Sequence, residues 1–167
     1  MATRSENTVT INQPAEKVHR ALTSADYWTH IAATLSPEPG ELNSFEEKDG
    51  GAEATLFEVL PLEILPEAVR AMISQALKVK RVVNVGPLAD GKADVTYTAD
   101  VKGTPVDFKG EIALAGDDAS TTLSYDNEVS VNIPFMGPAI EPKVGDALGD
   151  LFNNEGELTE KWIAENL

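Results

Sequence analysis

A strict alternation of apolar and polar residues over 92–102 constrains this chain most. Every second side chain there is apolar, and the residues between them are Lys, Asp or Thr. A period of two is typical of a β-strand that buries one face and leaves the other in water. Two later segments repeat the alternation, and turn sequences separate such segments over 41–133. This region therefore predicts a curved antiparallel sheet with one apolar face. The turn sequences are Asp49-Gly50-Gly51, Asp90-Gly91-Lys92, Gly103-Thr104-Pro105 and Gly116-Asp117-Asp118.

Helical patterns precede and follow the predicted strands in the sequence. Residues 3–12 end in a strand-like alternation, and two short helices with apolar faces follow between Pro14 and Pro37. Residues 138–166 carry the longest helical pattern, with Pro142 near its start. Three glycines in it indicate either close packing or a deformable helix. The stripe on one face consists of Ile140, Val144, Ala147, Leu148, Leu151, Glu155, Leu158, Trp162 and Ile163.

A segment with several prolines interrupts the predicted strands. After Pro61 the apolar residues recur at helical spacing, and Pro66 suits a helix start, so we expect a short helix over about 66–74. This helix is either a packed connection or a lid over a cavity. The sequence has no internal repeat and no linker-like stretch, and its 167 residues with 42% hydrophobic content suit one domain over 1–167.

Composition excludes several classes of function. The net charge of −15 opposes nucleic acids and anionic membranes, whose binding needs Lys and Arg. Because no stretch approaches 18 apolar residues and residues 1–7 contain no export signal, we expect no membrane insertion and a cytoplasmic location. With no Cys and two His, we expect no disulfide, thiolate nucleophile or metal site. The fingerprints of nucleotide cofactors are absent too, so no cofactor is expected.

One short motif links this element order to a known superfamily. Val9-Thr10-Ile11-Asn12-Gln13-Pro14-Ala15-Glu16-Lys17-Val18 leads into Ala21-Leu22-Thr23-Ser24-Ala25-Asp26-Tyr27-Trp28. Strand, two short helices, hairpins and a long last helix, opened by this motif, resemble the START-like or Bet v 1-like superfamily. Its helix-grip fold implies an α+β chain in which about seven strands wrap around the C-terminal helix, with a cavity for apolar molecules between them. The chain also resembles a bacterial family that has the insertion after Leu60-Pro61 and the motif Ile133-Pro134-Phe135-Met136-Gly137. Neither resemblance implies a particular reaction.

Several polar residues fall on strand faces that should be apolar. The alternation places Tyr97, Tyr125 and Asn127 inward, and Arg81 as well if Val79 and Val83 point inward. Such groups either satisfy one another in a filled core or orient the polar end of a ligand. An inward Arg81 without a carboxylate partner would suit a ligand carboxylate or phosphate. The predicted cavity-lining residues are Trp28, Arg81, Tyr97, Phe108, Tyr125, Asn127, Leu148 and Phe152.

Three functions remain open from the sequence, and so does the oligomeric state. The first is the binding of a small hydrophobic or amphipathic molecule, lipid-like or polyketide-like, which predicts a cavity of at least about 300 Å³. The second is an enzyme of the cyclase or dehydratase type that uses Tyr97, Arg81 or His30, although no residue is assigned as catalytic. The third is an interaction module like the co-chaperone members, which would need an exposed apolar patch. His30 is otherwise a solvent-facing helix residue, and His19 is expected on the outer face of its helix.

Overall fold

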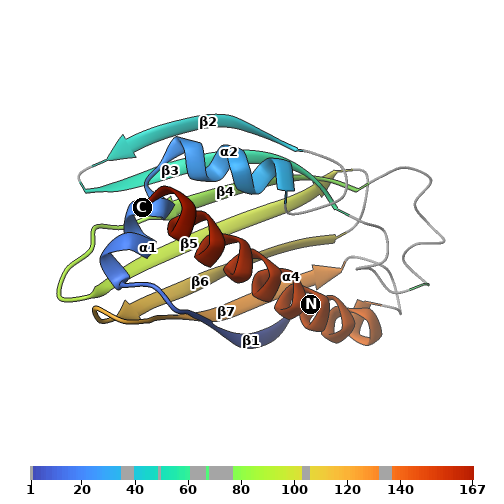
Figure 1. Ribbon diagram of the computed structural model, residues 1–167. Helices are drawn as coiled ribbons and strands as arrows, with labels where there is room; N and C mark the ends of the chain where they lie inside the picture. The colour runs from blue at the N-terminus through green and yellow to red at the C-terminus, as the bar shows by residue number, and fades with distance from the viewer. Residues whose placement is uncertain are drawn as a thin grey trace.

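In the described part of the computed structural model, seven strands form one antiparallel sheet and three helices lie on one of its faces (Figure 1). The structure describes residues 2–34, 40–48, 50–60, 67, 77–102, 106–131 and 137–167, without the side chains of 2, 59, 60, 77, 102, 137–140, 147 and 148. The elements are β1 (Ala2–Ile11), α1 (Ala15–Leu22), α2 (Ala25–Thr34), β2 (Glu41–Lys48), β3 (Gly51–Leu60), β4 (Leu77–Val85), β5 (Lys92–Lys102), β6 (Val106–Gly116), β7 (Thr121–Val131) and α4 (Gly137–Asn166).

The strands follow the order β1-β7-β6-β5-β4-β3-β2. The first strand therefore pairs with the last, while every other neighbour is consecutive along the chain, and β1 and β2 form the two edges. Helix α4 packs mainly on β1 and β7, whereas α2 packs on β2 and β3 (Figure 1). The middle strands β4 and β5 lie between these two contact areas. This arrangement is the helix grip that the element order predicted.

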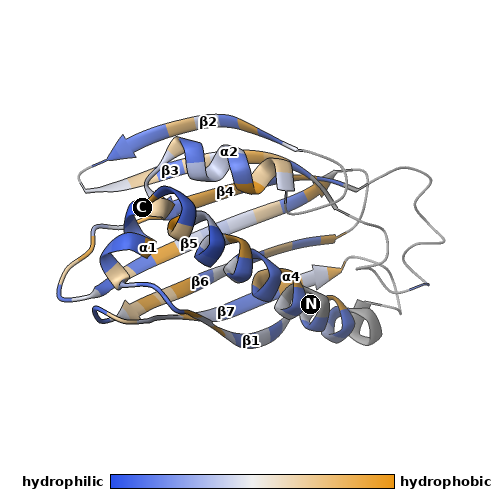
Figure 2. Ribbon diagram, in the orientation of Figure 1, coloured by the Kyte–Doolittle hydropathy of each residue, from blue (hydrophilic) through white to orange (hydrophobic). Residues whose placement is uncertain are grey.

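Alternate burial along the strands explains why they form a sheet with one dry face. In β5 the odd-numbered residues are buried and the even-numbered ones are exposed, as the sequence pattern predicted, and β7 also buries its odd-numbered residues. Figure 2 shows the resulting bands of hydrophobic and hydrophilic residues along the strands. The hydrophobic core is continuous between this face and the three helices. The predicted turn before β5 is a two-residue hairpin turn, in which Asp90 and Gly91 have φ of 54° and 74°.

The C-terminal helix is confirmed over almost the predicted range. It contains Pro142 in its second turn. A Cβ atom at Gly156 would overlap Cγ1 of Val9, and one at Gly145 would lie 3.0 Å from Cβ of Ser5. These two glycines therefore serve close packing, because they let the backbone of α4 approach β1.

Some predictions fall on parts of the chain that lie outside the described residues. They are the helix over 66–74, of which only Glu67 is described, the turn over 103–105 and residues 133–136 of the motif before α4. Among the helices that are described, none combines the length and the apolar character that crossing a membrane requires.

Candidate functional site

A buried cluster of charges lies on the inner face of the sheet, under α4. Arg81 of β4 donates two hydrogen bonds to Glu155 of α4, from Nη1 to Oε2 at 3.0 Å and from Nη2 to Oε1 at 2.5 Å. A second carboxylate, Glu58 of β3, lies with Oε1 3.4 Å from Nη1 of the same arginine. The side chains of Glu58, Arg81 and Glu155 are 3%, 7% and 8% exposed. We call these three residues the Glu58–Arg81–Glu155 cluster.

The sheet register brings the two strand residues of the cluster together. In the β3–β4 ladder Arg81 pairs with Leu56 and Glu58 pairs with Val79, so the two charged residues are diagonal neighbours on one face. Arg81 thus points inward, as the projection suggested, but it has two carboxylate partners. The condition for a ligand carboxylate or phosphate, an inward arginine without a carboxylate partner, is therefore not met.

Burial and mutual attraction set the protonation of the cluster. Burial raises the pKa of Glu58; Arg81 counteracts this and Glu155 adds to it. For Arg81, burial alone would lower the pKa, but Glu155 and Glu58 outweigh it and the pKa of the guanidinium is raised. Within the described part of the chain, Oε1 of Glu58 has no hydrogen-bond partner. An ionised carboxylate in that position is costly, which is the physical reason for the raised pKa of Glu58.

Helix α2 completes the surroundings of the cluster. The Arg81 guanidinium lies 5.4 Å from the centroid of the Trp28 ring, within range of a cation–π interaction. The hydroxyls of Tyr27 and Thr159 are hydrogen-bonded at 2.6 Å, and Thr159 donates to the Glu155 carbonyl at 2.7 Å. Burial, followed by the charge of Glu155, raises the pKa of Tyr27, so this tyrosine keeps its proton.

A second polar network crosses the sheet beside the cluster. Tyr97 of β5 donates to Oδ1 of Asn127 on β7 at 2.5 Å, and Nδ2 of Asn127 donates to Oδ1 of Asn7 on β1 at 2.8 Å. The residue between Tyr97 and Asn127 in the same row of the sheet is Gly110. A Cβ there would lie 2.7 Å from Cε1 of Tyr97, so only glycine lets the ring cross β6. Tyr97 and Asn127 thus satisfy one another, which is the filled-core alternative.

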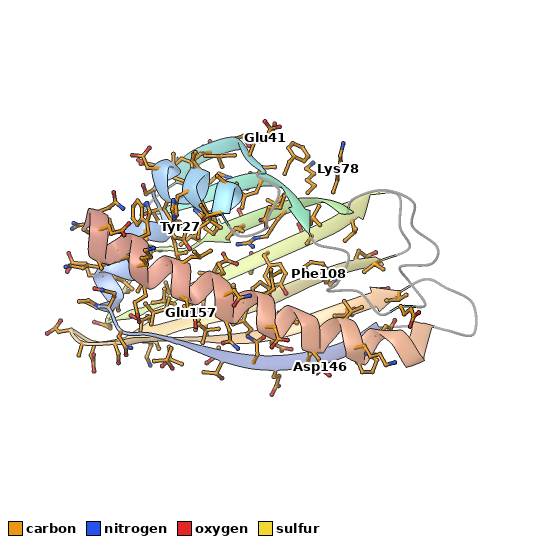
Figure 3. All side chains as sticks on the ribbon, turned by 45° about the vertical axis from the view of Figure 1, so that its right-hand side comes forward. Tyr27, Glu41, Lys78, Phe108, Asp146 and Glu157 are labelled. Carbon is orange, nitrogen blue, oxygen red and sulfur yellow. The ribbon has the colours of Figure 1, made fainter. Side chains whose placement is uncertain are left out.

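A cavity of about 30 Å³ lies between the sheet and α4. It has Arg81 and Glu155 in its wall, but Glu58 is not one of its lining residues. Of the predicted lining residues, Phe108 and Asn127 are buried without lining it, and the side chain of Leu148 lies outside the described residues. Figure 3 shows Phe108 in the crowded space between α4 and the sheet. The cavity is lined by Leu22, Trp28, Arg81, Val83, Val95, Tyr97, Ile112, Leu123, Tyr125, Phe152 and Glu155.

Aromatic packing makes the cavity much smaller than expected. It has about a tenth of the volume of roughly 300 Å³ that ligand sites usually reach, and it has room for about one water molecule. Tyr125 and Phe152 stack with ring centroids 4.4 Å apart, and Tyr97 meets Phe152 edge-on at 5.5 Å. These rings occupy the space where a ligand was predicted. The Tyr125 hydroxyl nevertheless has no hydrogen-bond partner among the described residues.

The two histidines lie apart from this cavity. Nε2 of His19 is hydrogen-bonded at 2.8 Å to the carbonyl of Gly86, and His19 is half-buried on α1. His30 is half-buried on α2 and does not line the cavity. Neither histidine is placed to act on a molecule inside it.

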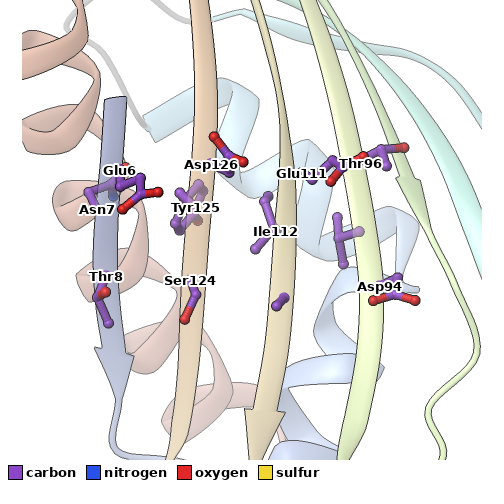
Figure 4. A pocket seen from close by; sticks show the side chains of 12 residues that line it. Glu6, Asn7, Thr8, Asp94, Thr96, Glu111, Ile112, Ser124, Tyr125 and Asp126 are labelled. Carbon is purple, nitrogen blue, oxygen red and sulfur yellow. The ribbon is translucent and has the colours of Figure 1, made fainter. Parts of the chain in front are cut away.

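The outer face of the sheet has a larger but open hollow. It measures about 710 Å³ and is lined mostly by exposed acidic and hydroxyl side chains of β1, β5, β6 and β7. Figure 4 shows Glu6, Asp94, Glu111 and Asp126 on the side of the sheet that faces away from the helices. Among the described residues, no three His, Asp or Glu side chains are grouped to hold a metal ion. Because the hollow is open to solvent and no member of the Glu58–Arg81–Glu155 cluster lines it, the interior cavity is the stronger candidate site.

Two members of the cluster were missing from the predicted site, although the sequence contains a signal for each. Glu58 follows Ala52, Ala54 and Leu56 at a period of two, which places it on the inner face of β3. Glu155 stands in the apolar stripe of the last helix. A carboxylate at an inward position needs a cationic partner, and Arg81 was already a predicted inward residue that could supply the positive charge.

The arrangement of strands and helices defines the class of fold: it is similar to the helix-grip fold of START-like proteins. A START superfamily protein from Mycobacterium smegmatis superposes with a TM-score of 0.57 over 98% of this chain and 99% of its own, at 14% identity. The Zhui aromatase/cyclase from a Streptomyces species superposes with a TM-score of 0.54 over 99% of this chain and 93% of its own, also at 14% identity. At such identities the likeness shows the shared fold.

Within that class the chain belongs to the family described as "Protein of unknown function (DUF2505)", which matches residues 6–163. A relative from Mycobacterium tuberculosis, the uncharacterized protein Rv0481c, is 29% identical over 162 residues, and the match covers 91% of each chain.

Proposed function

We propose that this protein binds a small hydrophobic or amphipathic molecule between the sheet and α4. The observation that carries the proposal is the Glu58–Arg81–Glu155 cluster, which presents an ion pair to an otherwise aromatic and aliphatic cavity. Charged residues that are buried, coupled and placed at a cavity are typical of functional sites.

The stability of the fold does not explain such a cluster. Replacing a buried ion pair or triad by apolar residues of similar volume is often neutral or stabilising by roughly 1–4 kcal/mol. If the chain needed only a stable core at this position, Leu or Met in place of the three charged residues would keep or raise its stability. A role in recognising the polar end of a ligand gives a reason for the charges.

A ligand needs more room than the cavity of about 30 Å³ offers. The stacked rings of Tyr125 and Phe152 form its wall, and rotation of one of them is the simplest way to widen it. In this proposal the ligand stabilises a conformer with a wider cavity than the one described above.

The two other functions have less support. Tyr97 donates to Asn127 and Arg81 is held by two carboxylates, so neither offers an unused group to a cyclase-type substrate, even though a cyclase shares the fold. An interaction module would present an apolar patch, and among the described side chains Leu167 is the one large apolar residue that is exposed.

Native mass spectrometry of the freshly purified protein tests the proposal. We expect a small molecule that stays with the folded chain and is released on denaturation, or, for protein stripped of it, saturable binding of the neutral apolar dye Nile red. The matched variants are Ile112→Trp and Leu158→Trp. Both residues are half-buried and packed against the core, but only Ile112 lines the cavity. Ile112→Trp should lose binding and Leu158→Trp should retain it.

Two results would contradict the proposal. One is a bare chain that also fails to bind Nile red. The other is equal binding by both tryptophan variants, because the ligand would then lie elsewhere. The proposal includes a cytoplasmic location, which the lack of cysteine supports and which fractionation of cells expressing the protein would check.

A further inference from the structure

The Glu58–Arg81–Glu155 cluster contains two acidic side chains and one basic side chain. Two carboxylates share one guanidinium, so the cluster is neutral only when it holds one additional proton. Glu155 occupies the guanidinium through two hydrogen bonds, while Glu58 approaches it only at 3.4 Å. Glu58 is also the more deeply buried carboxylate, at 3% exposure. The additional proton therefore belongs on Glu58.

The cavity wall itself presents one positive and one negative group. Arg81 and Glu155 line the cavity, and Glu58 does not. A ligand carboxylate would meet Glu155 and would find Arg81 already paired. A ligand ammonium would meet Arg81; the charge of Glu155 is already balanced by that arginine, and Glu58 does not line the cavity. Because an unpaired charge in such surroundings is costly, ligands of either charge are disfavoured.

An uncharged hydroxyl suits the same wall. The Glu155 carboxylate has lone pairs beyond the two that accept from Arg81, so it can accept a further hydrogen bond. The Tyr125 hydroxyl, which has no partner among the described residues, can donate to the ligand oxygen. The remaining lining is aromatic or aliphatic, with Trp28, Tyr97 and Phe152 beside Tyr125. Planar rings fit between such side chains.

From this juxtaposition we infer that the cavity takes an uncharged aromatic alcohol or phenol and rejects carboxylates and amines of the same shape. The inference rests on the proposed binding function and adds the chemical class of the ligand. Its recognition elements are the paired Arg81 and Glu155 and the free hydroxyl of Tyr125.

Three probes of one shape test the inference: 2-naphthol, 2-naphthoate and 2-naphthylmethylammonium. Their binding to the full chain is measured by isothermal titration calorimetry at pH 7. We expect 2-naphthol to bind more than about tenfold more tightly than either ion. Equal or tighter binding of 2-naphthoate or of the amine would overturn the inference while leaving the binding function intact. Failure of all three probes, together with Nile red, would overturn both.

A charge-altered variant provides the sharper test. Glu58→Gln/Glu155→Gln leaves Arg81 without a carboxylate, so the preference should reverse in favour of 2-naphthoate. The matched control is Glu157→Gln/Glu165→Gln, which removes two exposed carboxylates from α4 and should keep the preference for 2-naphthol. A folded cluster variant that still prefers 2-naphthol would contradict the role of the charges. If this variant does not fold, Tyr125→Phe tests the inference instead. This substitution should lower the affinity for 2-naphthol several-fold and leave the affinity for naphthalene unchanged. An unchanged affinity for 2-naphthol would refute the role of the Tyr125 hydroxyl.

Discussion

Removal of Arg81 should destabilise the protein far more than removal of the whole charge cluster. In Arg81→Met, the buried carboxylate of Glu155 loses the guanidinium that donates two hydrogen bonds to it, and breaking a buried pair in this way costs about 3–5 kcal/mol. At about 2–4 °C per kcal/mol for a chain of this size, the midpoint of thermal unfolding should fall by roughly 6–20 °C. The side chains concerned are at most 8% exposed, so solvent offers little relief.

The matching variant, Glu58→Leu/Arg81→Met/Glu155→Leu, removes the one guanidinium and both carboxylates together. We expect its free energy of unfolding to equal that of the original protein or to exceed it by about 1–4 kcal/mol. Thermal and urea unfolding followed by circular dichroism at pH 7 measure both variants. Arg20→Met serves as the control, because Arg20 forms an exposed pair with Glu16 and should change stability by less than about 0.5 kcal/mol. A triple variant less stable than Arg81→Met, or an Arg81→Met within about 1 kcal/mol of the original, would refute the reasoning.

Three further predictions concern the helix, the protonation of the cluster and the second polar network. Gly156→Ala should lower the free energy of unfolding by about 1–3 kcal/mol, because its Cβ would clash with Val9. Gly149→Ala should raise the free energy of unfolding by up to about 1 kcal/mol, because its Cβ would lie 3.9 Å from Cβ of Asn7. Thermal unfolding that ranks the two variants the other way would contradict the close packing of α4. Because the pKa of Glu58 is raised above 4.5 in the folded state, the folded chain holds the proton more tightly, so this group's contribution to stability is full below pH 4.5 and is lost as the pH rises through the folded pKa. Glu58→Gln should therefore gain stability relative to the original protein as the pH increases. Urea unfolding measures this, and a difference in free energy of unfolding between the two proteins that stays constant from pH 4 to pH 8 would exclude it. Tyr97→Phe leaves Oδ1 of Asn127 without its donor and should cost about 1–3 kcal/mol in chemical unfolding, while a neutral effect would mean that the bond to Asn127 is replaced by water.

The architecture was predictable because local patterns and global fold agree. The alternation over 92–102 appears in the structure as the dry and wet faces of β5, and the pattern over 138–166 as α4. Such agreement is expected where one face of each element is buried in a common core, since the period then records the burial.

The site was predictable only in part, for reasons that can be named. The orientation of Arg81 was ambiguous because Val82 and Val83 are both apolar, so neither face of β4 is marked by the sequence. Its pairing with Glu58 depends on the register between β3 and β4, and its pairing with Glu155 depends on where α4 crosses the sheet. The cavity volume depends on the side-chain torsions of Phe152 and Tyr125, on which the alternation pattern carries no information.

The pairing of β1 with β7 also determines when the sheet can be completed during synthesis of the chain. Ile11 and Thr121 are register partners that stand 110 residues apart (121 − 11). At synthesis rates of about 5–20 residues per second, β1 waits roughly 5–20 s on the ribosome for its partner. Until β7 and then α4 emerge, β1 lacks the strand that pairs with its edge and the helix that packs on it in the folded chain. The pairing of β1 with β7 is therefore the strand pairing that completes the sheet last, and we expect chaperones to bind the nascent chain at β1.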